Sequence, residues 1–131
     1  MRKLGTGYSK YFNVKYQRKG YVLQNRFKAV HIKSDEQLKI VWAYIHANPI
    51  SCMEPEWKKR GIRNLKKVLE FLKHYKWSSY PDYIGESNFP SVTERKFILK
   101  TVGSEKSCKE FLKYYIRYRG RVKESSEFTL E

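Results

Sequence analysis

A tyrosine and an asparagine stand four positions apart in the segment 34–48, where a helix would carry both on one flank. With 3.6 residues per turn, the side chains of Tyr44 and Asn48 project from the same side, one turn apart. A phenol held beside polar groups on a rigid helix is a candidate nucleophile. The alternative is a boundary residue that buries its ring and leaves its hydroxyl in water, because an ordinary phenol has a pKa of about 10 and seldom acts as a nucleophile. The residues alone leave both interpretations open.

The positive charge of the chain is concentrated in residues 1–34. The 131 residues include 28 Lys and Arg against 13 Asp and Glu, which gives a net charge of +15. The segment 1–34 has no acidic residue and holds nine basic ones, which are Arg2, Lys3, Lys10, Lys15, Arg18, Lys19, Arg26, Lys28 and Lys33. Such a segment predicts a polyanionic partner, most often nucleic acid. The alternative is a basic protein without such a partner.

Aromatic residues are interspersed with the basic residues of this segment. A mixture of this kind is typical of single-strand binding, in which rings stack on bases and cations follow the phosphates. Tyr16 and Tyr21 are the better stacking candidates, because Tyr8, Tyr11 and Phe12 also belong to the apolar stripe of a helix. The residues expected to contact the nucleic acid are Lys10, Lys15, Arg18, Lys19, Arg26 and Lys28.

The histidines and cysteines show no local metal-binding pattern. His31, His46 and His74 are scattered, and Cys52 and Cys108 lie 56 positions apart. This spacing excludes a cysteine-based zinc site and favours a reducing, cytoplasmic location. No stretch approaches the roughly 20 apolar residues of a membrane helix, so we expect no membrane partner.

The elements that must position these residues are mostly helices. An apolar stripe from Met1 to Phe12 predicts a first helix, and residues 21–32 alternate as in two short strands or one bent strand, with a break near Asn25. Ser34 and Gln37 form a capping box for a helix over 34–48, which Pro49 ends. The buried stripe of that helix is expected at Leu38, Val41, Trp42 and Ile45.

Further helices are predicted towards the C-terminus. Asn64 caps one, a turn at residues 77–80 leads to a short one through Ile84, and Ser91 or Thr93 caps another that ends at Gly103. The last begins at Ser104 and buries Cys108, Phe111, Leu112, Tyr115 and Ile116. We expect one domain over residues 1–120, with about five helices and one hairpin or bent strand, and a disordered tail over 121–131.

Four stretches of the sequence together resemble one family. They are MRKLGTGYSKYFNVKYQRKGYVLQNRFKAVHI at the N-terminus, Ser34-Asp35-Glu36, YIHANPI at 44–50 and YKWSSYPDYIG at 75–85. Their order and spacing over residues 1–85 resemble the REP-associated tyrosine transposases, which belong to the insertion-sequence-200-like single-tyrosine transposases of bacteria. The stretch 52–74 is longer than the usual link in that family.

The resemblance implies a ferredoxin-like α+β fold and the cutting and rejoining of single-stranded DNA beside hairpins. It places the nucleophile at Tyr44, which would form a 5′-phosphotyrosine bond and release a 3′-hydroxyl. It also implies a divalent cation, Mg²⁺ or Mn²⁺, with Asn48 as one ligand and two more from a His-hydrophobic-His strand.

That strand precedes the MRKLGTGYSKYFN helix in the family, and this chain starts inside that helix. The resemblance thus implies the C-terminal portion of a transposase, helix-rich and without the histidine pair. Two hypotheses follow: a single-stranded-DNA transposase or its remnant that acts through Tyr44, and a non-catalytic nucleic-acid-binding fragment. A decay product without activity is a third.

Overall fold

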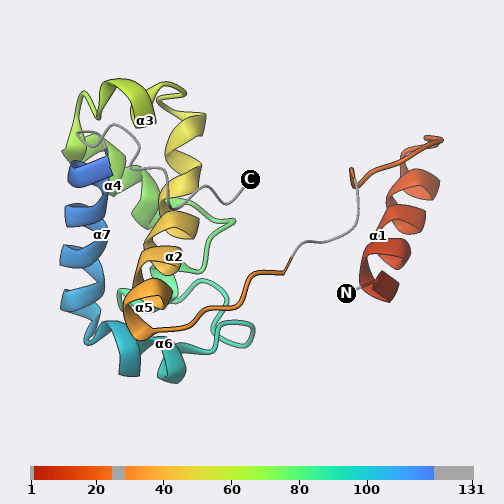
Figure 1. Cartoon of the computed structure of the whole chain (residues 1–131). Helices are drawn as coiled ribbons and strands as arrows, with labels where there is room; N and C mark the ends of the chain where they lie inside the picture. The colour runs from red at the N-terminus through yellow and green to blue at the C-terminus, as the bar shows by residue number, and fades with distance from the viewer. Residues whose placement is uncertain (1, 25–28, 120–131) are drawn as a thin grey trace. The chain divides into compact units, whose positions relative to one another are not determined.

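The computed structural model of the chain describes residues 2–24 and 29–119, and these residues are helical or irregular (Figure 1). The chain divides into two compact units, residues 1–32 and residues 33–131. The described part of the first unit holds helix α1, Arg2–Lys15, and that of the second holds six α-helices and one 3-10 helix. The expected α+β class, a remnant of a ferredoxin-like sheet, is therefore wrong, because the described residues form an all-α structure.

The hairpin or bent strand expected over 21–32 is absent from the described part of this segment. Residues 21–24 and 29–32 form no strand pairing, and Tyr21 is 97% exposed. A strand needs a neighbour for its backbone N–H and C=O groups, and two short strands alone are only marginally stable in water. Apolar and polar residues alternate here, but no described segment offers an edge to pair with. Asn25 lies outside the described residues.

Helix α1 forms as its apolar spacing predicts, but none of its residues is buried. Leu4, Tyr8 and Tyr11 are each more than half exposed. The apolar stripe of α1 thus forms no buried core among the described residues.

Helix α2, Asp35–Ala47, confirms the helix predicted over 34–48, and Ser34 caps it as expected. The Gln37 N–H donates to the Ser34 hydroxyl at 3.2 Å. The Gln37 side chain then accepts from the N–H of Lys33 at 2.7 Å, one residue before the N–H that a capping box would use. Asp35 and Glu36 place negative charge in the first turn, where the helix dipole favours it.

The buried side of α2 is rotated relative to the predicted stripe. Ile45 is 56% exposed, whereas His46 is buried beside Ala43 and Ala47. Hydrophobicity alone predicts that Ile45 is buried and His46 exposed. His46 can be buried because both of its ring nitrogens have hydrogen-bond partners, which removes most of the free-energy cost of burial. The two alanines have small side chains, and they let another helix approach closely.

Three short elements follow α2: the 3-10 helix η1, Asn48–Cys52, then α3, Trp57–Arg60, and α4, Leu65–His74. Trp57 is buried and its indole N–H donates to the Ser51 hydroxyl at 3.2 Å, which fixes α3 against η1. Asn64 caps α4 as predicted, with its side chain accepting from the N–H of Lys67 at 3.1 Å.

The C-terminal half contains α5, Tyr80–Tyr83, α6, Arg95–Val102, and α7, Glu105–Arg119. Glu94 caps α6 by accepting from the Lys96 N–H, so the expected caps Ser91 and Thr93 are wrong. Thr93 instead donates to a buried carboxylate on α5. Gly103, with φ of 110°, ends α6 as predicted. The expected tail, 121–131, lies outside the described residues.

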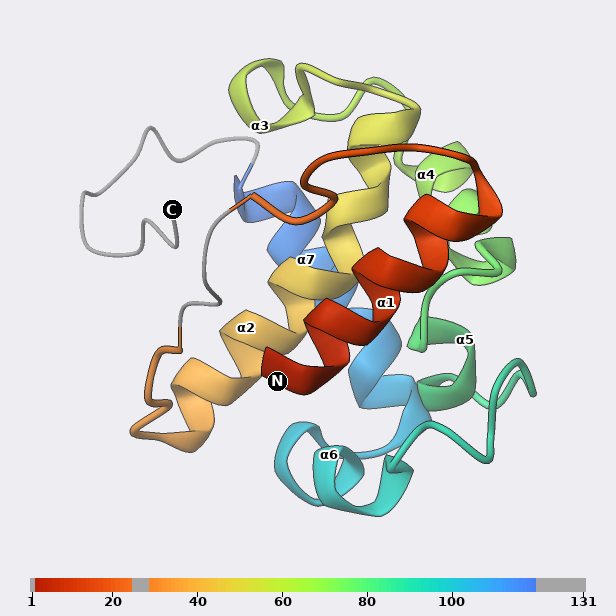
Figure 2. The same ribbon diagram turned by 90° about the vertical axis from the view of Figure 1, so that its right-hand side faces the viewer.

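Helices α2 and α7 form the centre of the second unit and run side by side in the same direction (Figures 1 and 2). Helix α7 buries Cys108, Leu112, Tyr115 and Ile116 as its spacing predicts. Because the two helices run in parallel, their C-terminal ends lie at the same end of the unit, close to α3 (Figure 1). No helix among the described residues is long and apolar enough to span a membrane.

Candidate nucleic-acid interface

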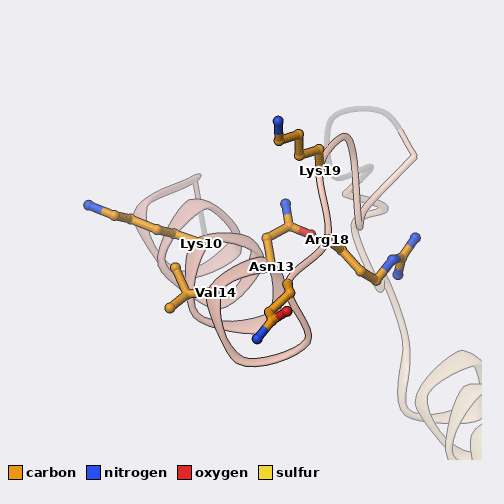
Figure 3. Close-up of a pocket in the computed structure, with 6 residues that line it drawn as sticks. Lys10, Asn13, Val14, Arg18 and Lys19 are labelled. Carbon is orange, nitrogen blue, oxygen red and sulfur yellow. The ribbon is translucent and has the colours of Figure 1, made fainter.

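Four of the six cations predicted to bind nucleic acid lie at the C-terminal end of α1. Lys10 and Lys15 belong to the helix, Arg18 and Lys19 follow it directly, and all four are exposed. Three of them line an open depression of about 470 Å³ (Figure 3), together with Asn13, Val14 and Gln17. Arg26 and Lys28, the other two predicted contacts, lie outside the described residues.

The loop that carries Arg18 and Lys19 is held against the helix by Asn13. The Asn13 side-chain amide donates to the Gly20 carbonyl at 2.8 Å, and the Arg18 N–H donates to the Asn13 carbonyl at 2.8 Å. Gln17 takes a φ of 50° and Gly20 a φ of 98°, so the chain reverses direction through two left-handed residues. The cations after the helix are therefore kept beside those on it.

Aromatic rings accompany these cations. The Phe12 and Tyr16 ring centroids are 4.6 Å apart. The Lys15 ammonium lies 5.6 Å from the Tyr11 centroid and 5.5 Å from that of Tyr16, and the Arg18 guanidinium lies 5.7 Å from that of Phe12. These distances suit cation–π attraction, and the exposed tyrosines present faces on which bases can stack.

Tyr44, the predicted nucleophile, is half-buried in the second half of α2. Its ring packs against the core of the second unit, and the Lys58 ammonium of α3 lies 5.0 Å from its ring centroid. Asn48 is exposed and caps the same helix, with its backbone N–H directed at the carbonyls of Tyr44 and Ile45. The two residues thus follow one another along one helix, as their spacing predicts.

The sequence did not indicate Lys58, which lies over the Tyr44 ring, or the pair Tyr115 and Arg119 on α7. Lys58 comes from α3, and Tyr115 and Arg119 come from α7, where the guanidinium lies 5.9 Å from the Tyr115 ring centroid. Burial raises the pKa of Tyr115, the Arg119 charge opposes this, and the neighbouring Tyr44 phenol adds to the increase. The Lys-Lys-Arg run at 58–60 is the only local signal, because Tyr115 is brought towards Tyr44 by the packing of α7 on α2, and Arg119 lies beside Tyr115.

The histidine closest to Tyr44 in the sequence, His46, has both ring nitrogens engaged in hydrogen bonds. His46 points into the core, where burial lowers its pKa to about 4, partly opposed by its hydrogen bond to the Trp42 carbonyl. His31 and His74 are exposed, the first in the irregular part of the first unit and the second at the end of α4.

The cation implied by the resemblance, Mg²⁺ or Mn²⁺, needs several oxygen or imidazole ligands in fixed geometry. Asn48 offers one amide oxygen. No group of three or more His, Cys, Asp or Glu side chains in residues 2–24 and 29–119 could hold a metal ion. The described residues around Tyr44 and Asn48 therefore do not fit this cation.

Comparison with family models, curated proteins and solved structures gives no match.

Proposed function

We propose that this chain binds single-stranded or hairpin DNA through the basic unit 1–32. One observation carries the proposal: Lys10, Lys15, Arg18 and Lys19 are gathered, with exposed tyrosines, at one end of a single helix. A cytoplasmic location is part of the same proposal, since DNA and a reducing environment are found there.

The chemistry of this end of α1 supports a nucleic-acid ligand. Each cation that meets a phosphate releases counterions from the strand, and this release supplies most of the sequence-independent affinity. Stacking of a base on an aromatic ring adds about 1–3 kcal/mol per base in single-strand binding proteins. The described part of unit 1–32 contains no acidic residue that would repel a phosphate.

Salt titration of the full chain on a labelled hairpin oligonucleotide tests the proposal. If the six predicted cations each neutralise one phosphate, log K should fall against log[salt] with a slope of about −4 on single strands. Tight binding with an affinity that does not depend on salt concentration, or no binding at low salt, would refute an electrostatic interface.

A matched pair of variants locates the interface. One carries Lys10, Lys15, Arg18 and Lys19 as Gln, and the other carries Gln at the exposed residues Lys66, Lys67, Lys96 and Lys100 of the second unit. Both variants lose four positive charges, so the non-specific electrostatic attraction between the chain and the DNA falls equally. The first variant should show a slope reduced in magnitude by about 3, and the second should change far less. Equal losses would mean that net charge alone attracts the DNA.

A second candidate is cleavage and rejoining of single-stranded DNA by Tyr44. The observation in its favour is the Lys58 ammonium beside the half-buried phenol on a capped helix. In such a step the phenol oxygen would attack phosphorus and the bond from phosphorus to the 3′-oxygen would break. The 3′-oxygen would take up a proton, and the 5′-phosphate would remain on Tyr44.

A further inference from the structure

Two pairs, each of one phenol and one cation, lie at the same end of the second unit. Tyr44 comes from α2, Lys58 from α3, and Tyr115 with Arg119 from α7, at the end where α2, α3 and α7 come together (Figure 1). Both phenol rings pack on one hydrophobic core. The Tyr44 phenol is close enough to Tyr115 to add to the increase in the pKa of Tyr115.

Each phenol has a cation over or beside its ring, and neither cation is paired with a described carboxylate. The ion pairs among the described residues join other side chains, namely Lys73 with Glu86, His74 with Glu70, and Lys113 with Glu110. As far as residues 2–24 and 29–119 are concerned, Lys58 and Arg119 therefore keep donors available for a ligand. Lys58 lies in the stretch 52–74, which is longer than the corresponding link in the transposases that the sequence resembles. Arg119 lies after residue 85, where the resemblance ends.

We propose that Lys58 and Arg119 hold a backbone phosphate of the bound nucleic acid against the hydroxyls of Tyr44 and Tyr115, as a second anion site separate from unit 1–32. This inference rests on the proposed nucleic-acid binding and adds to it a contact in the second unit. No covalent step is involved.

The donor chemistry suits a phosphate. Arginine presents a planar fork of N–H groups that matches two phosphate oxygens, and lysine adds a point charge with three donors. A tyrosine that stays protonated can donate its O–H to a third oxygen. Burial raises the pKa of Tyr115, although Arg119 offsets part of the increase, so this phenol keeps its proton at neutral pH.

A purely structural role is the competing explanation. The C-terminal ends of α2 and α7 carry partial negative charge, and Lys58 and Arg119 could serve only to offset it. A structural role predicts a loss of folding stability on substitution without any change in the salt dependence of binding. A phosphate site predicts a change in that dependence.

The test compares three variants of the full chain on an unstructured oligothymidylate. The double variant Lys58→Gln/Arg119→Gln removes the proposed donors. The control Lys59→Gln/Arg117→Gln removes the same charge from exposed neighbours on the same two helices. The conservative variant Lys58→Arg/Arg119→Lys keeps both charges. Thermal unfolding of each variant shows whether the fold is retained.

We expect the slope of log K against log[salt] to become about 0.7 less negative in the double variant, the value of one phosphate contact, with a roughly three- to tenfold lower affinity at low salt. The control and conservative variants should match the wild type to within half of that change. An oligonucleotide with 5-iodouracil should, on irradiation, crosslink to Tyr44 or Tyr115 in the wild type.

A double variant with the slope of the control, and crosslinks confined to unit 1–32, would overturn the second site and leave the proposed function intact. A wild type that binds no oligonucleotide at any salt concentration would instead refute both. Loss of stability in the double variant with an unchanged slope would establish the structural role and also overturn the site.

Discussion

The Nε2 atom of His46 lies 3.0 Å from the hydroxyl of Ser79, a bond that joins the second half of α2 to the residue before α5. The Nδ1 atom lies 2.7 Å from the Trp42 carbonyl, which can only accept. Nδ1 therefore carries the proton of the neutral ring, and Nε2 accepts from Ser79. The ring is enclosed by Trp42, with centroids 4.6 Å apart, and by Tyr83, whose edge-on ring is 5.5 Å away.

The fold should lose stability on mild acidification because of His46. Its pKa is lowered to about 4 by burial, against about 6.5 in an unfolded chain. Between these values the unfolded chain binds the extra proton and the folded chain does not, so the free energy of unfolding falls as pH drops from about 6.5 to about 4. The loss should reach about 3 kcal/mol and then level off. Urea unfolding at a series of pH values measures it.

His46→Gln should remove this pH dependence, and His31→Gln, at an exposed position, should preserve it. A wild type whose stability is constant between pH 6.5 and pH 4 would show that the imidazole is not held neutral.

Asp82 should stabilise the loop between α5 and α6. Its carboxylate is buried and accepts from the N–H of Asn88 at 2.8 Å, the N–H of Phe89 at 3.1 Å and the hydroxyl of Thr93 at 3.2 Å. Burial raises the pKa of Asp82, but these hydrogen bonds outweigh it and the net pKa is lowered. In Asp82→Asn, the amide N–H₂ would face the N–H and O–H groups that now donate to the carboxylate, and neither side could accept a hydrogen bond. The variant should therefore lower the free energy of unfolding by about 2 kcal/mol.

Thermal unfolding at pH 7 checks this expectation, with Glu86→Gln as the control. Glu86 forms an exposed ion pair with Lys73, 3.1 Å long, and such pairs contribute at most about 1 kcal/mol. Equal destabilisation by the two variants would contradict the role given to Asp82.

The helices of the second unit could be predicted because their signals are local. Ser34 and Asn64 act as caps where the pattern places them, and the stripe from Cys108 to Ile116 is buried. Sheet pairing and the burial of a polar side chain depend on distant residues. The alternation at 21–32 therefore led to the wrong prediction of an α+β fold. The rotation of α2 that buries His46 follows from the hydrogen bond between His46 and Ser79, which are far apart in the sequence.

The two cysteines should differ in reactivity. Cys108 is fully buried on α7, and burial, with the Glu105 charge adding to it, raises the pKa of its thiol to about 11. Cys52 is exposed at the end of η1. Ellman's reagent should titrate one thiol quickly in the folded chain and two after denaturation, because the thiolate is the reactive form. Cys52→Ser should abolish the fast phase, and a fast second thiol would show that α7 opens readily.

Charge reversal should be more damaging at the end of α1 than on the outer face of α7. Arg18→Glu changes a residue that lines the depression after α1, whereas Lys113→Glu changes one that is already paired with Glu110 at 3.5 Å. Both variants lower the net charge by two. Filter binding at low salt should show several-fold weaker DNA binding for the first and little change for the second. A larger loss of DNA binding for Lys113→Glu than for Arg18→Glu would indicate that the interface lies on the second unit.

Only some of the neighbouring residues in the candidate site could be predicted from the sequence. The i, i+4 relation of Tyr44 and Asn48 follows from helix geometry alone, so it could be predicted. Lys58 reaches the Tyr44 ring from α3, and Arg119 lies beside Tyr115 on α7; no spacing in the chain encodes how these helices pack on α2. The absence of metal ligands around Asn48, within the described residues, likewise depends on where His46 points rather than on its position in the YIHANPI motif.

The final prediction concerns catalysis by Tyr44. With Mg²⁺ or Mn²⁺ added, the 131-residue chain should form no covalent adduct with a labelled single-stranded hairpin. Transfer of a phosphoryl group to a phenol requires neutralisation of the phosphate charge and loss of the phenol proton. Lys58 supplies one positive charge, but Asn48 alone cannot hold a divalent cation, and His46 is engaged in the core. A denaturing gel after incubation with each metal ion measures the adduct. A band that appears in the wild type and disappears in Tyr44→Phe would establish tyrosine transfer, because the phenylalanine ring keeps the packing on the core and removes only the hydroxyl. A band that survives Tyr44→Phe would place the nucleophile elsewhere in the chain.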